Sequence, residues 1–365
     1  MKMRSSKSIW RLLDTGPRPA AYNMALDKAI LTARSQDRVA NTLRFLEFSP
    51  PCALIGYHQA VELEVEEGYC REHGIDINRR ITGGGGIYLD EGQIGWEIFV
   101  HKDTPRIPKN LEEMYRRICE GAIAGLARLG VKAQFRPKND LEVEGRKISG
   151  SGGAEFEDAI LYHGTLLTDF DVDTMIKCLK LPVHKLDDKP IQSFKKRVIC
   201  LREVLGYLPS LPVIKRSLME GFMEFFEIPL EPGDLTDYEK LMLEKELPRF
   251  QSEEWIRGPR PKLQNSTLSV ADHKTRGGLI RASVLLDPTR QRIKSAFITG
   301  DFFAYPERSI LDLEAALKDS ASHPPDIWKA VSKWFAEGRI RIPGIEPDDF
   351  YQALCLAIRK ANNSR

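Results

Sequence analysis

The spacing of apolar residues predicts two long amphipathic helices in the first half of the chain. Residues 22–30 place apolar side chains every three or four positions and follow two prolines, which are common just before a helix. Residues 111–129 carry a longer stripe of the same period and stop at Gly130, a residue typical of helix C-termini. Further helices are expected near residues 198–205, 213–226 and 236–246.

Between these helices the period of the pattern changes to two, as in strands. Apolar residues alternate over Ile94–Val100, so residues 75–100 are predicted to run as strand, glycine-rich loop, strand, turn and strand. A hairpin is expected around Glu144-Gly145, and another strand over Ile160–Leu167. Because strands and helices interleave without a regular βαβ repeat, we expect an α+β fold with mixed, mostly antiparallel sheets packed against helices.

The length of 365 residues exceeds what one core normally holds, so two domains are expected. Glycine and two prolines within Trp255–Pro261 mark the junction. The tail that follows has its own hairpin, over residues 279–299, a helix capped by Ser309 and a last helix over residues 348–360. We therefore predict a large domain over residues 1–255 and a small α/β accessory domain over residues 262–365.

Composition and charge exclude several functions. Lys and Arg number 54 against 52 Asp and Glu, and the resulting net charge of +2 provides no field for binding nucleic acid or an anionic membrane. The N-terminus has no apolar run typical of a secretory signal, so a cytoplasmic protein is expected. The six cysteines form no CxxC pair, which disfavours a zinc site or a disulfide framework and favours reduced, packed thiols.

The densest candidate for chemistry is Arg79–Gly86, where two arginines precede Ile-Thr and four glycines. Glycine lets backbone N–H groups approach a ligand, and arginine binds carboxylate or phosphate, so an anionic ligand is the simplest interpretation. The run is neither a P-loop nor a GxGxxG motif. An exposed turn with solvated arginines remains the alternative.

Two further segments could contribute to the same chemistry. Lys147 lies on a predicted hairpin strand and is followed by small residues, after Asn139-Asp140, so a single ammonium could point into a cleft. His163-Gly164-Thr165-Leu166 lies on the next predicted strand. Taken alone, Lys147 could equally be a solvated strand lysine and His163 a hydrogen-bonded strand histidine.

Together these motifs resemble the lipoate-protein ligase A family of the biotin/lipoate ligase superfamily. They occur in the family's order, and the resemblance is densest over residues 20–170, with the tail similar to the ligases' accessory domain. The motifs are Tyr22-Asn23-Met24-Ala25-Leu26-Asp27, Ile55-Gly56-Tyr57-His58-Gln59, Arg79–Gly86 with Asp90, Asn139-Asp140, Lys147-Ile148-Ser149-Gly150 and His163-Gly164-Thr165-Leu166.

The resemblance implies an ATP-dependent ligase that activates lipoate, or octanoate, as an acyl-adenylate and passes it to a lysine of a carrier protein. Lys147 would be the catalytic residue, since its ammonium would neutralise the attacking carboxylate and the α-phosphate. ATP and Mg²⁺ would be cofactors, with Asp140 as a candidate Mg²⁺ ligand. The residues implied to bind substrate or nucleotide are His58, Arg79, Arg80, Thr82, Gly83, Gly84, Gly85, Gly86, Asn139, Asp140, Ser149, Gly150, His163, Gly164, Thr165 and Leu166.

The sequence departs from the family at the edge of the glycine run. Many relatives have histidine before the aspartate at position 90, whereas this chain has Leu89, and its run is one glycine longer than the usual three. Both departures bear on the path of the loop and on acyl or carrier specificity.

Three alternatives share the resemblance. Octanoyl- and lipoyl-transferases of the same fold use a cysteine nucleophile and no ATP, but no cysteine lies between Asn139 and Lys177. A non-catalytic lipoate-binding protein would not need to retain Lys147. A biotin ligase is disfavoured because its GRGRxG-type loop is missing. The ligase is therefore the main prediction.

The implied partner is a lipoyl carrier, such as an H protein, a 2-oxoacid dehydrogenase lipoyl domain or a lipoate-binding protein. The enzyme itself is expected to be a monomer. Lys195-Lys196-Arg197 is a candidate basic patch for an acidic carrier surface, with a merely solvated face as the alternative.

Overall fold

The computed structural model describes residues 9–137, 139–180, 196–258, 268–287, 289–306 and 308–363. The chain forms two compact units. Unit 1 comprises Met1–Leu54, Glu64–Asn78 and Ile87–Ser252, and unit 2 comprises Ile55–Leu63, Arg79–Gly86 and Glu253–Arg365. Unit 2 thus includes two short segments from the N-terminal half of the chain. The domain limits of 1–255 and 262–365 stay a prediction, because residues 259–267 lie outside the described ranges.

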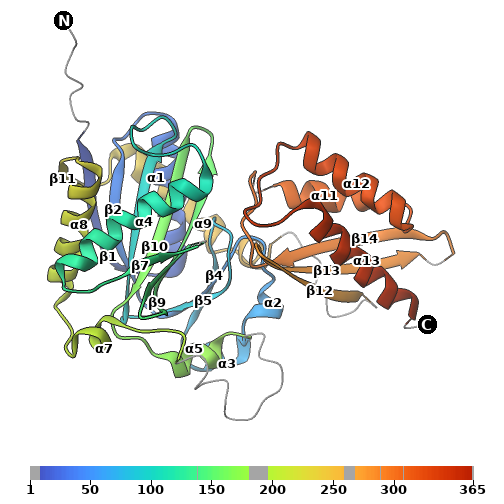
Figure 1. The fold of residues 1–365 in the computed structure, drawn as a ribbon, viewed down its shortest axis with the longest axis horizontal. Helices are drawn as coiled ribbons and strands as arrows, with labels where there is room; N and C mark the ends of the chain where they lie inside the picture. The colour runs from blue at the N-terminus through green and yellow to red at the C-terminus, as the bar shows by residue number, and fades with distance from the viewer. Residues whose placement is uncertain are drawn as a thin grey trace, which may run out of the picture. The chain divides into compact units, whose positions relative to one another are not determined.

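Unit 1 is built around an eight-stranded sheet in the order β11-β1-β2-β6-β10-β9-β8-β7 (Figure 1). β1 runs parallel to β2 and β11, and the other pairs are antiparallel, so the predicted mostly antiparallel α+β fold is confirmed. The strands are β1 (Trp10–Arg18), β2 (Thr42–Phe48), β6 (Gln93–His101), β7 (Gln134–Arg136), β8 (Asp140–Val143), β9 (Arg146–Phe156), β10 (Ala159–Leu167) and β11 (Leu230–Pro232).

The predicted helices of this unit form close to the expected bounds. The first follows Pro19, and the second begins where the Asn110 side chain accepts a hydrogen bond from the Glu113 N–H and stops before Gly130, whose φ is 85°. The helix expected over 198–205 is shorter. The helices are α1 (Ala20–Ser35), α3 (Glu67–Glu72), α4 (Leu111–Arg128), α5 (Val172–Cys178), α7 (Leu201–Leu205), α8 (Leu211–Phe226) and α9 (Asp237–Phe250), with α2 (Val61–Glu64) at the limit of the two units.

Two layers of helices cover the two faces of the large sheet. On one face α4 and α8 lie side by side, and the Phe222 ring of α8 packs on Trp96 of β6 with ring centroids 5.3 Å apart. On the other face lies α1, whose Asp27 contacts Arg44 of β2. Neighbouring residues along each strand therefore point toward different helices.

A second, short sheet in the order β4-β3-β5 carries the strands that lead into and out of the glycine run. They are β3 (Cys52–Ile55), β4 (Asp76–Arg79) and β5 (Ile87–Leu89). Leu89 is buried and pairs with Cys52, so the residue that departs from the family pattern packs inside this sheet.

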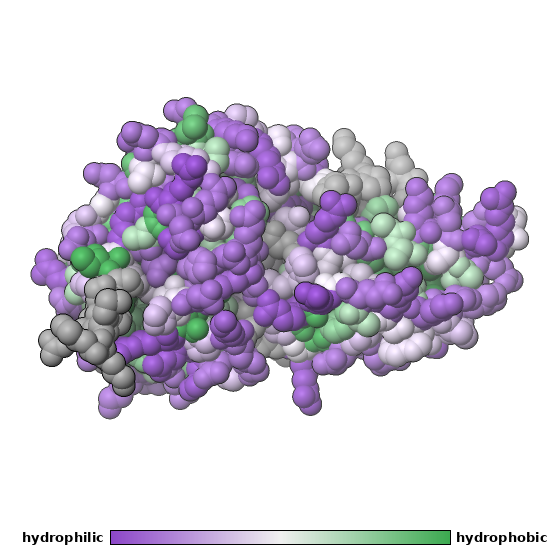
Figure 2. All heavy atoms as spheres, turned by 90° about the horizontal axis from the view of Figure 1, so that it is seen from above, coloured by the Kyte–Doolittle hydropathy of each residue, from purple (hydrophilic) through white to green (hydrophobic). Residues whose placement is uncertain are grey.

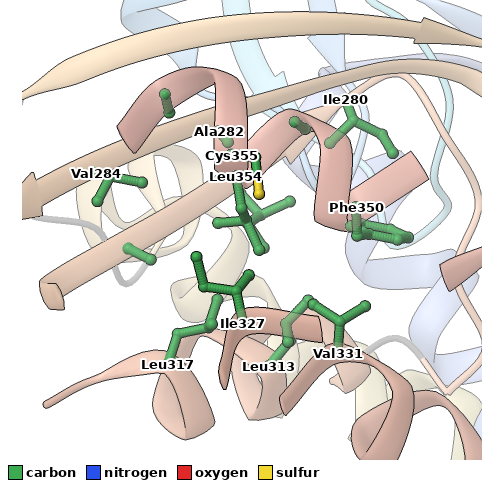
Figure 3. Close-up of a cluster of buried hydrophobic side chains, with 14 of the residues drawn as sticks. Ile280, Ala282, Val284, Leu313, Leu317, Ile327, Val331, Phe350, Leu354 and Cys355 are labelled. Carbon is green, nitrogen blue, oxygen red and sulfur yellow. The ribbon is translucent and has the colours of Figure 1, made fainter. Parts of the chain in front are cut away.

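The C-terminal part of unit 2 is a three-stranded antiparallel sheet with helices packed on it. α13 packs on β12 and β13, α11 packs on β14, and α12 packs on both helices. Apolar side chains from all of these elements form one core, part of which is drawn in Figure 3. The elements are α10 (Glu253–Arg257), β12 (Ser269–Thr275), β13 (Gly278–Asp287), β14 (Arg292–Gly300), α11 (Ser309–Leu317), α12 (Pro324–Glu337) and α13 (Pro347–Asn363).

The expected cap of α11 is wrong. Ser309 is the first residue of the helix rather than its N-cap, and its buried hydroxyl has no hydrogen-bond partner among the described residues. The Ser309 carbonyl instead accepts a hydrogen bond from Trp334 Nε1 at 2.7 Å, which ties α11 to α12. Tertiary packing therefore fixes the start of this helix.

The surface seen in Figure 2 is mostly polar, with apolar side chains in small scattered groups. Within the described ranges, no helix is both long enough and apolar enough to cross a bilayer.

Candidate functional site

Lys147 lies on β9 and forms an ion pair with Asp140 of β8, with 2.7 Å between Nζ and Oδ1. The two side chains are 40% and 25% exposed, so the pair is open to solvent on one side. Lys147 lies over Gly150, where a Cβ, if present, would come within 2.7 Å of Nζ. The backbone of Lys147 is fixed by hydrogen bonds to Arg197 and Ile199. The ammonium of Lys147 is thus held by the Asp140 carboxylate and lies above Gly150, which has no side chain.

The strand register places further predicted residues on the same face as this pair. Thr165 of β10 lies opposite Gly150, which in turn lies opposite Asp140. His163, two residues before Thr165, shares the face and lies opposite Glu97 of β6. Asp140, Gly150, His163 and Thr165 are thus brought together on the sheet face that α1 covers.

Three other predicted residues point to the opposite face. Ser149 and Leu166 are paired with each other and buried, and the Ser149 hydroxyl has no partner among the described residues. Gly164 lies under the indole ring of Trp96, which occupies the space that a Cβ would need. These residues belong to the packed core beneath α4. Their side chains therefore point away from a ligand bound on the Lys147 face.

Asn139 anchors the end of the same strands. Its side-chain amide donates to the Ser151 carbonyl, and its own carbonyl accepts from the Ser151 N–H at 2.9 Å and hydroxyl at 2.6 Å. The Ser151 hydroxyl is also 2.5 Å from the Tyr162 hydroxyl. Asn139 therefore holds β9 beside the segment that carries Asp140.

A buried charge cluster between this face and α1 was missed from the sequence. Arg44 is fully buried and donates to Asp27 at 2.6 Å, Glu97 at 3.0 Å and the Asn23 amide oxygen at 2.6 Å. Burial, followed by the Glu97 charge, raises the pKa of Asp27 well above its usual value, and burial also raises the pKa of Glu97. Both carboxyls beside this guanidinium therefore bind a proton more tightly than exposed carboxyls do.

The sequence contained a signal for only half of this cluster. Asn23 and Asp27 are one helical turn apart in the first motif and so had to share a helix face. Arg44 and Glu97 had no comparable signal, because they lie on strands whose partners are far away in sequence.

The glycine run begins with an arginine that is used entirely for backbone contacts. Arg79 is buried, and its guanidinium donates to carbonyl groups of two segments of unit 2. The acceptors are Gly56 at 3.1 Å, Tyr57 at 2.7 Å, Gln59 at 2.6 Å, Trp255 at 3.1 Å and Ile256 at 3.0 Å. Trp255 Nε1 donates in return to the Arg79 carbonyl at 2.9 Å.

Arg80 has the same kind of role within the loop itself. Its guanidinium donates to the Thr82 hydroxyl at 3.0 Å and to the carbonyls of Gly83 and Gly85, both at 2.8 Å. Burial lowers the pKa of Arg80 to about 10, so it stays charged at neutral pH. Binding of anionic oxygens by Arg79 and Arg80 stays a prediction, whereas the contacts in the structure make both arginines braces of the loop.

Thr82, Gly83 and Gly84 are buried in unit 2, whereas Gly85 is exposed. The Tyr57 N–H donates to the Thr82 carbonyl at 2.8 Å. His58 is buried and stacks on Phe302, with ring centroids 5.2 Å apart. Gly83–Gly86 connect this region to β5.

All six cysteines lie in the described part of the chain and are free thiols, and Cys200 alone is not buried. Cys119 is buried beneath Ser151 and Tyr162, and burial raises its pKa to about 11, so it is a poor nucleophile. A hydrogen bond from the Cys178 thiol lowers the pKa of Cys70, which is buried. Cys200 closely follows Val198, which pairs with Lys147.

The fold and site place the protein among the enzymes of lipoate ligation and transfer. The sequence profile of the lipoyl protein ligase A/B catalytic domain matches residues 19–223, and the chain belongs to this family.

Curated relatives refine this assignment. The chain is 33% identical to the octanoyltransferase LipM of Geobacillus kaustophilus over 275 residues, which covers 68% of this chain and 98% of that protein. LipM of Bacillus subtilis is 28% identical, with 68% and 98% covered.

Solved structures show the same architecture. An archaeal bi-partite lipoate protein ligase from Thermoplasma acidophilum matches with a TM-score of 0.63 and 28% identity, covering 70% of this chain and 99% of its own. LipL1 of P. falciparum, in complex with lipoate, covers 96% of this chain with a TM-score of 0.73 at 18% identity, a likeness of fold alone. The two-part fold therefore has a counterpart over nearly the whole chain.

These relatives overturn one prediction. The LipM proteins are named octanoyltransferases, and a transferase moves an acyl group that is already attached to a donor. The expected ATP-dependent ligase, with ATP and Mg²⁺ as cofactors, is therefore wrong. Asp140, the candidate Mg²⁺ ligand, is instead the ionic partner of Lys147.

Proposed function

We propose that the protein transfers an octanoyl group, or a lipoyl group of the same length, from a thioester donor to the acceptor lysine of a lipoyl domain. The reaction breaks the thioester C–S bond, forms an amide C–N bond and releases the donor thiol together with a proton from the acceptor ammonium. The main support is the match over nearly the whole length of the octanoyltransferases, which covers about two thirds of this chain, joined to the ion pair of Lys147 and Asp140.

Lys147 supplies the chemistry that this reaction needs most. Attack on the thioester carbonyl places negative charge on its oxygen, and a fixed ammonium nearby stabilises that oxyanion. Asp140 keeps the ammonium in one orientation, and the bare backbone at Gly150 gives the carbonyl room to approach. Thr165 and His163, on the same face, border this position.

The acyl group can pass directly to the lysine or pause on a cysteine of the enzyme. Cys200 is the thiol to test, because it is not buried and lies close along the chain to the segment paired with Lys147. Cys119→Ser is the matched control, since the Cys119 thiol is buried and has a raised pKa. A thioester trapped on the wild type and on Cys119→Ser, but not on Cys200→Ser, would establish the two-step route. Undiminished transfer by Cys200→Ser, with no thioester trapped on any cysteine of the enzyme, would establish the direct one.

The function is tested with the full chain, an octanoyl thioester of an acyl carrier protein and a purified lipoyl domain, without ATP. The mass of the lipoyl domain is expected to increase by one octanoyl group, and a domain whose acceptor lysine is replaced by arginine should stay unmodified. Modification that occurs only with free octanoate and ATP would contradict the proposal.

A further inference from the structure

The glycine run is embedded in the C-terminal part of the protein rather than in the large sheet. Gly83 and Gly84 belong to the same unit as Asp301–Phe303, which follow β14. The Gly84 N–H donates to the Phe302 carbonyl at 3.2 Å, and the Gly300 N–H donates to the His58 carbonyl at 3.3 Å. The loop and its neighbouring segment are thus hydrogen-bonded to the end of the last strand of the C-terminal sheet.

The closeness of this contact explains why glycines are needed. At Gly83 a Cβ would lie 2.5 Å from the Phe302 carbonyl oxygen and 2.9 Å from the Phe303 Cα. At Gly84 a Cβ would lie 3.1 Å from Cζ of Phe303 and 2.9 Å from Nη2 of Arg80, and φ there is 95°. Such distances exclude a side chain without movement of backbone at Gly83, and the positive φ favours glycine at Gly84.

Phe302 and Phe303 differ in what else they contact. Phe302 is fully buried, stacks on His58 and meets the Phe350 ring edge-on at 5.8 Å, so it joins the loop to the domain core. Phe303 is also buried, but it is not part of that core. A change at Phe303 therefore tests the loop contact with less damage to the domain.

We infer that Phe302 and Phe303 are positioning residues, through which the C-terminal domain sets the conformation of the glycine run. The inference rests on the proposed function together with the prediction, from the family resemblance, that Gly83–Gly86 bind the substrate. Residues 268–363 lie beyond the family match of 19–223, so the positioning device comes from outside the catalytic-domain profile. From the sequence, the glycines were expected to allow the close approach of a ligand. Gly83 and Gly84 are explained, in part, by the close approach of Phe302 and Phe303.

The first test measures loop order by amide hydrogen exchange in the full chain. Phe303→Ala is expected to speed exchange of the Gly84 and Tyr57 amides about tenfold or more, while Phe303→Leu restores most of the protection. Phe335→Ala is the matched control, because Phe335 packs against the core of the same domain from α12. Equal exchange at these amides in Phe303→Ala and Phe335→Ala would overturn the inference.

The second test measures octanoyl transfer by the same variants. Phe303→Ala should raise KM for the octanoyl donor about tenfold and change kcat about threefold or less, because the run is predicted to bind substrate and the variant leaves Lys147 unchanged. Phe335→Ala should leave both near the wild-type values.

A coupled variant separates this inference from a general loss of stability. The penalty of Gly84→Ala on KM should be smaller in the Phe303→Ala background than in the wild type, since one of the two close neighbours is gone. Equal penalties would contradict direct contact. If the wild-type protein transfers no acyl group, the proposed function fails, while the exchange comparison still decides whether Phe303 orders the loop.

Discussion

Lys147 and the pair Arg79-Arg80 look alike in the sequence, as cations beside small residues, but the fold uses them in opposite ways. The Lys147 side chain is 40% exposed and has one ionic partner in the described part of the chain, Asp140. The two arginines are buried and donate mainly to backbone carbonyls. A cation that is half open to solvent can meet a substrate, whereas one surrounded by carbonyls stabilises a loop. Burial and hydrogen-bond partners, not residue type, separate the two roles.

The largest expected effect is on transfer by Lys147→Ala. Loss of the group that stabilises the oxyanion should lower kcat about 10²–10³-fold, while the melting temperature stays near that of the wild type. The measurement is the rate of octanoyl transfer followed by the mass of the lipoyl domain. Lys102→Ala is the control, because Lys102 has a similar exposure of 37% and an acidic partner, Glu155. A fully active Lys147→Ala protein would remove the distinction between the two kinds of cation.

The next effect is on stability, in Arg79→Lys. Lysine keeps the charge but has three donors on one atom, so several buried carbonyls lose their partner, at about 1–3 kcal/mol each. Urea unfolding should show a loss of about 3 kcal/mol in the free energy of unfolding. The exposed Arg308→Lys, in the same unit, should change this free energy by about 0.5 kcal/mol or less. If Arg79→Lys weakened donor binding without loss of stability, Arg79 would be a ligand residue.

The smallest effect concerns the buried carboxyls beside Arg44. The pKa values of Asp27 and Glu97 are raised in the fold, so the folded state binds more protons than the unfolded state above the usual pKa of Asp, 3.8. Stability from these groups is therefore lost as the pH rises from that value through their folded pKa values. Asp27→Asn removes one titrating group and should make the free energy of unfolding depend less on pH. The change in slope should be at most about 1.4 kcal/mol per pH unit.

Urea unfolding of the wild type and Asp27→Asn between pH 5 and pH 8 measures this slope. The exposed Asp103→Asn serves as the control, since Asp103 lies at the surface with only Lys109 as an ionic partner among the described residues. Parallel pH profiles for the wild type and Asp27→Asn would show that the fold does not raise the pKa of Asp27.

The error about ATP has a physical origin. Ligation and transfer both include attack on an acyl carbonyl, which places negative charge on its oxygen. A lysine such as Lys147 therefore suits either reaction and does not distinguish them. A cysteine close to Lys147 in sequence would have made the distinction, and there is none between Asn139 and Lys177. In the structure the chain returns, and the Val198 segment, with Cys200 following it, pairs with Lys147 from about fifty residues away.

The sequence by itself determined the elements whose signals are local. Periodicity defined α1, α4, β6 and β10, and the positive φ angles of Glu144 and Gly145 agree with the predicted hairpin turn. Six short motifs in order sufficed for the family, because each preserves chemistry within a few residues.

Only the tertiary structure decided which faces these motifs present. The bulge between β8 and β9 and the strand register put Gly150 and Thr165 beside Lys147 but turn Ser149 and Leu166 into the core. Likewise, the glycine run was expected to accommodate a ligand, yet Gly83 and Gly84 also make room for Phe302 and Phe303, more than 200 residues away in the chain. Contacts between distant segments carry no local pattern, which is why the sequence alone could not supply them.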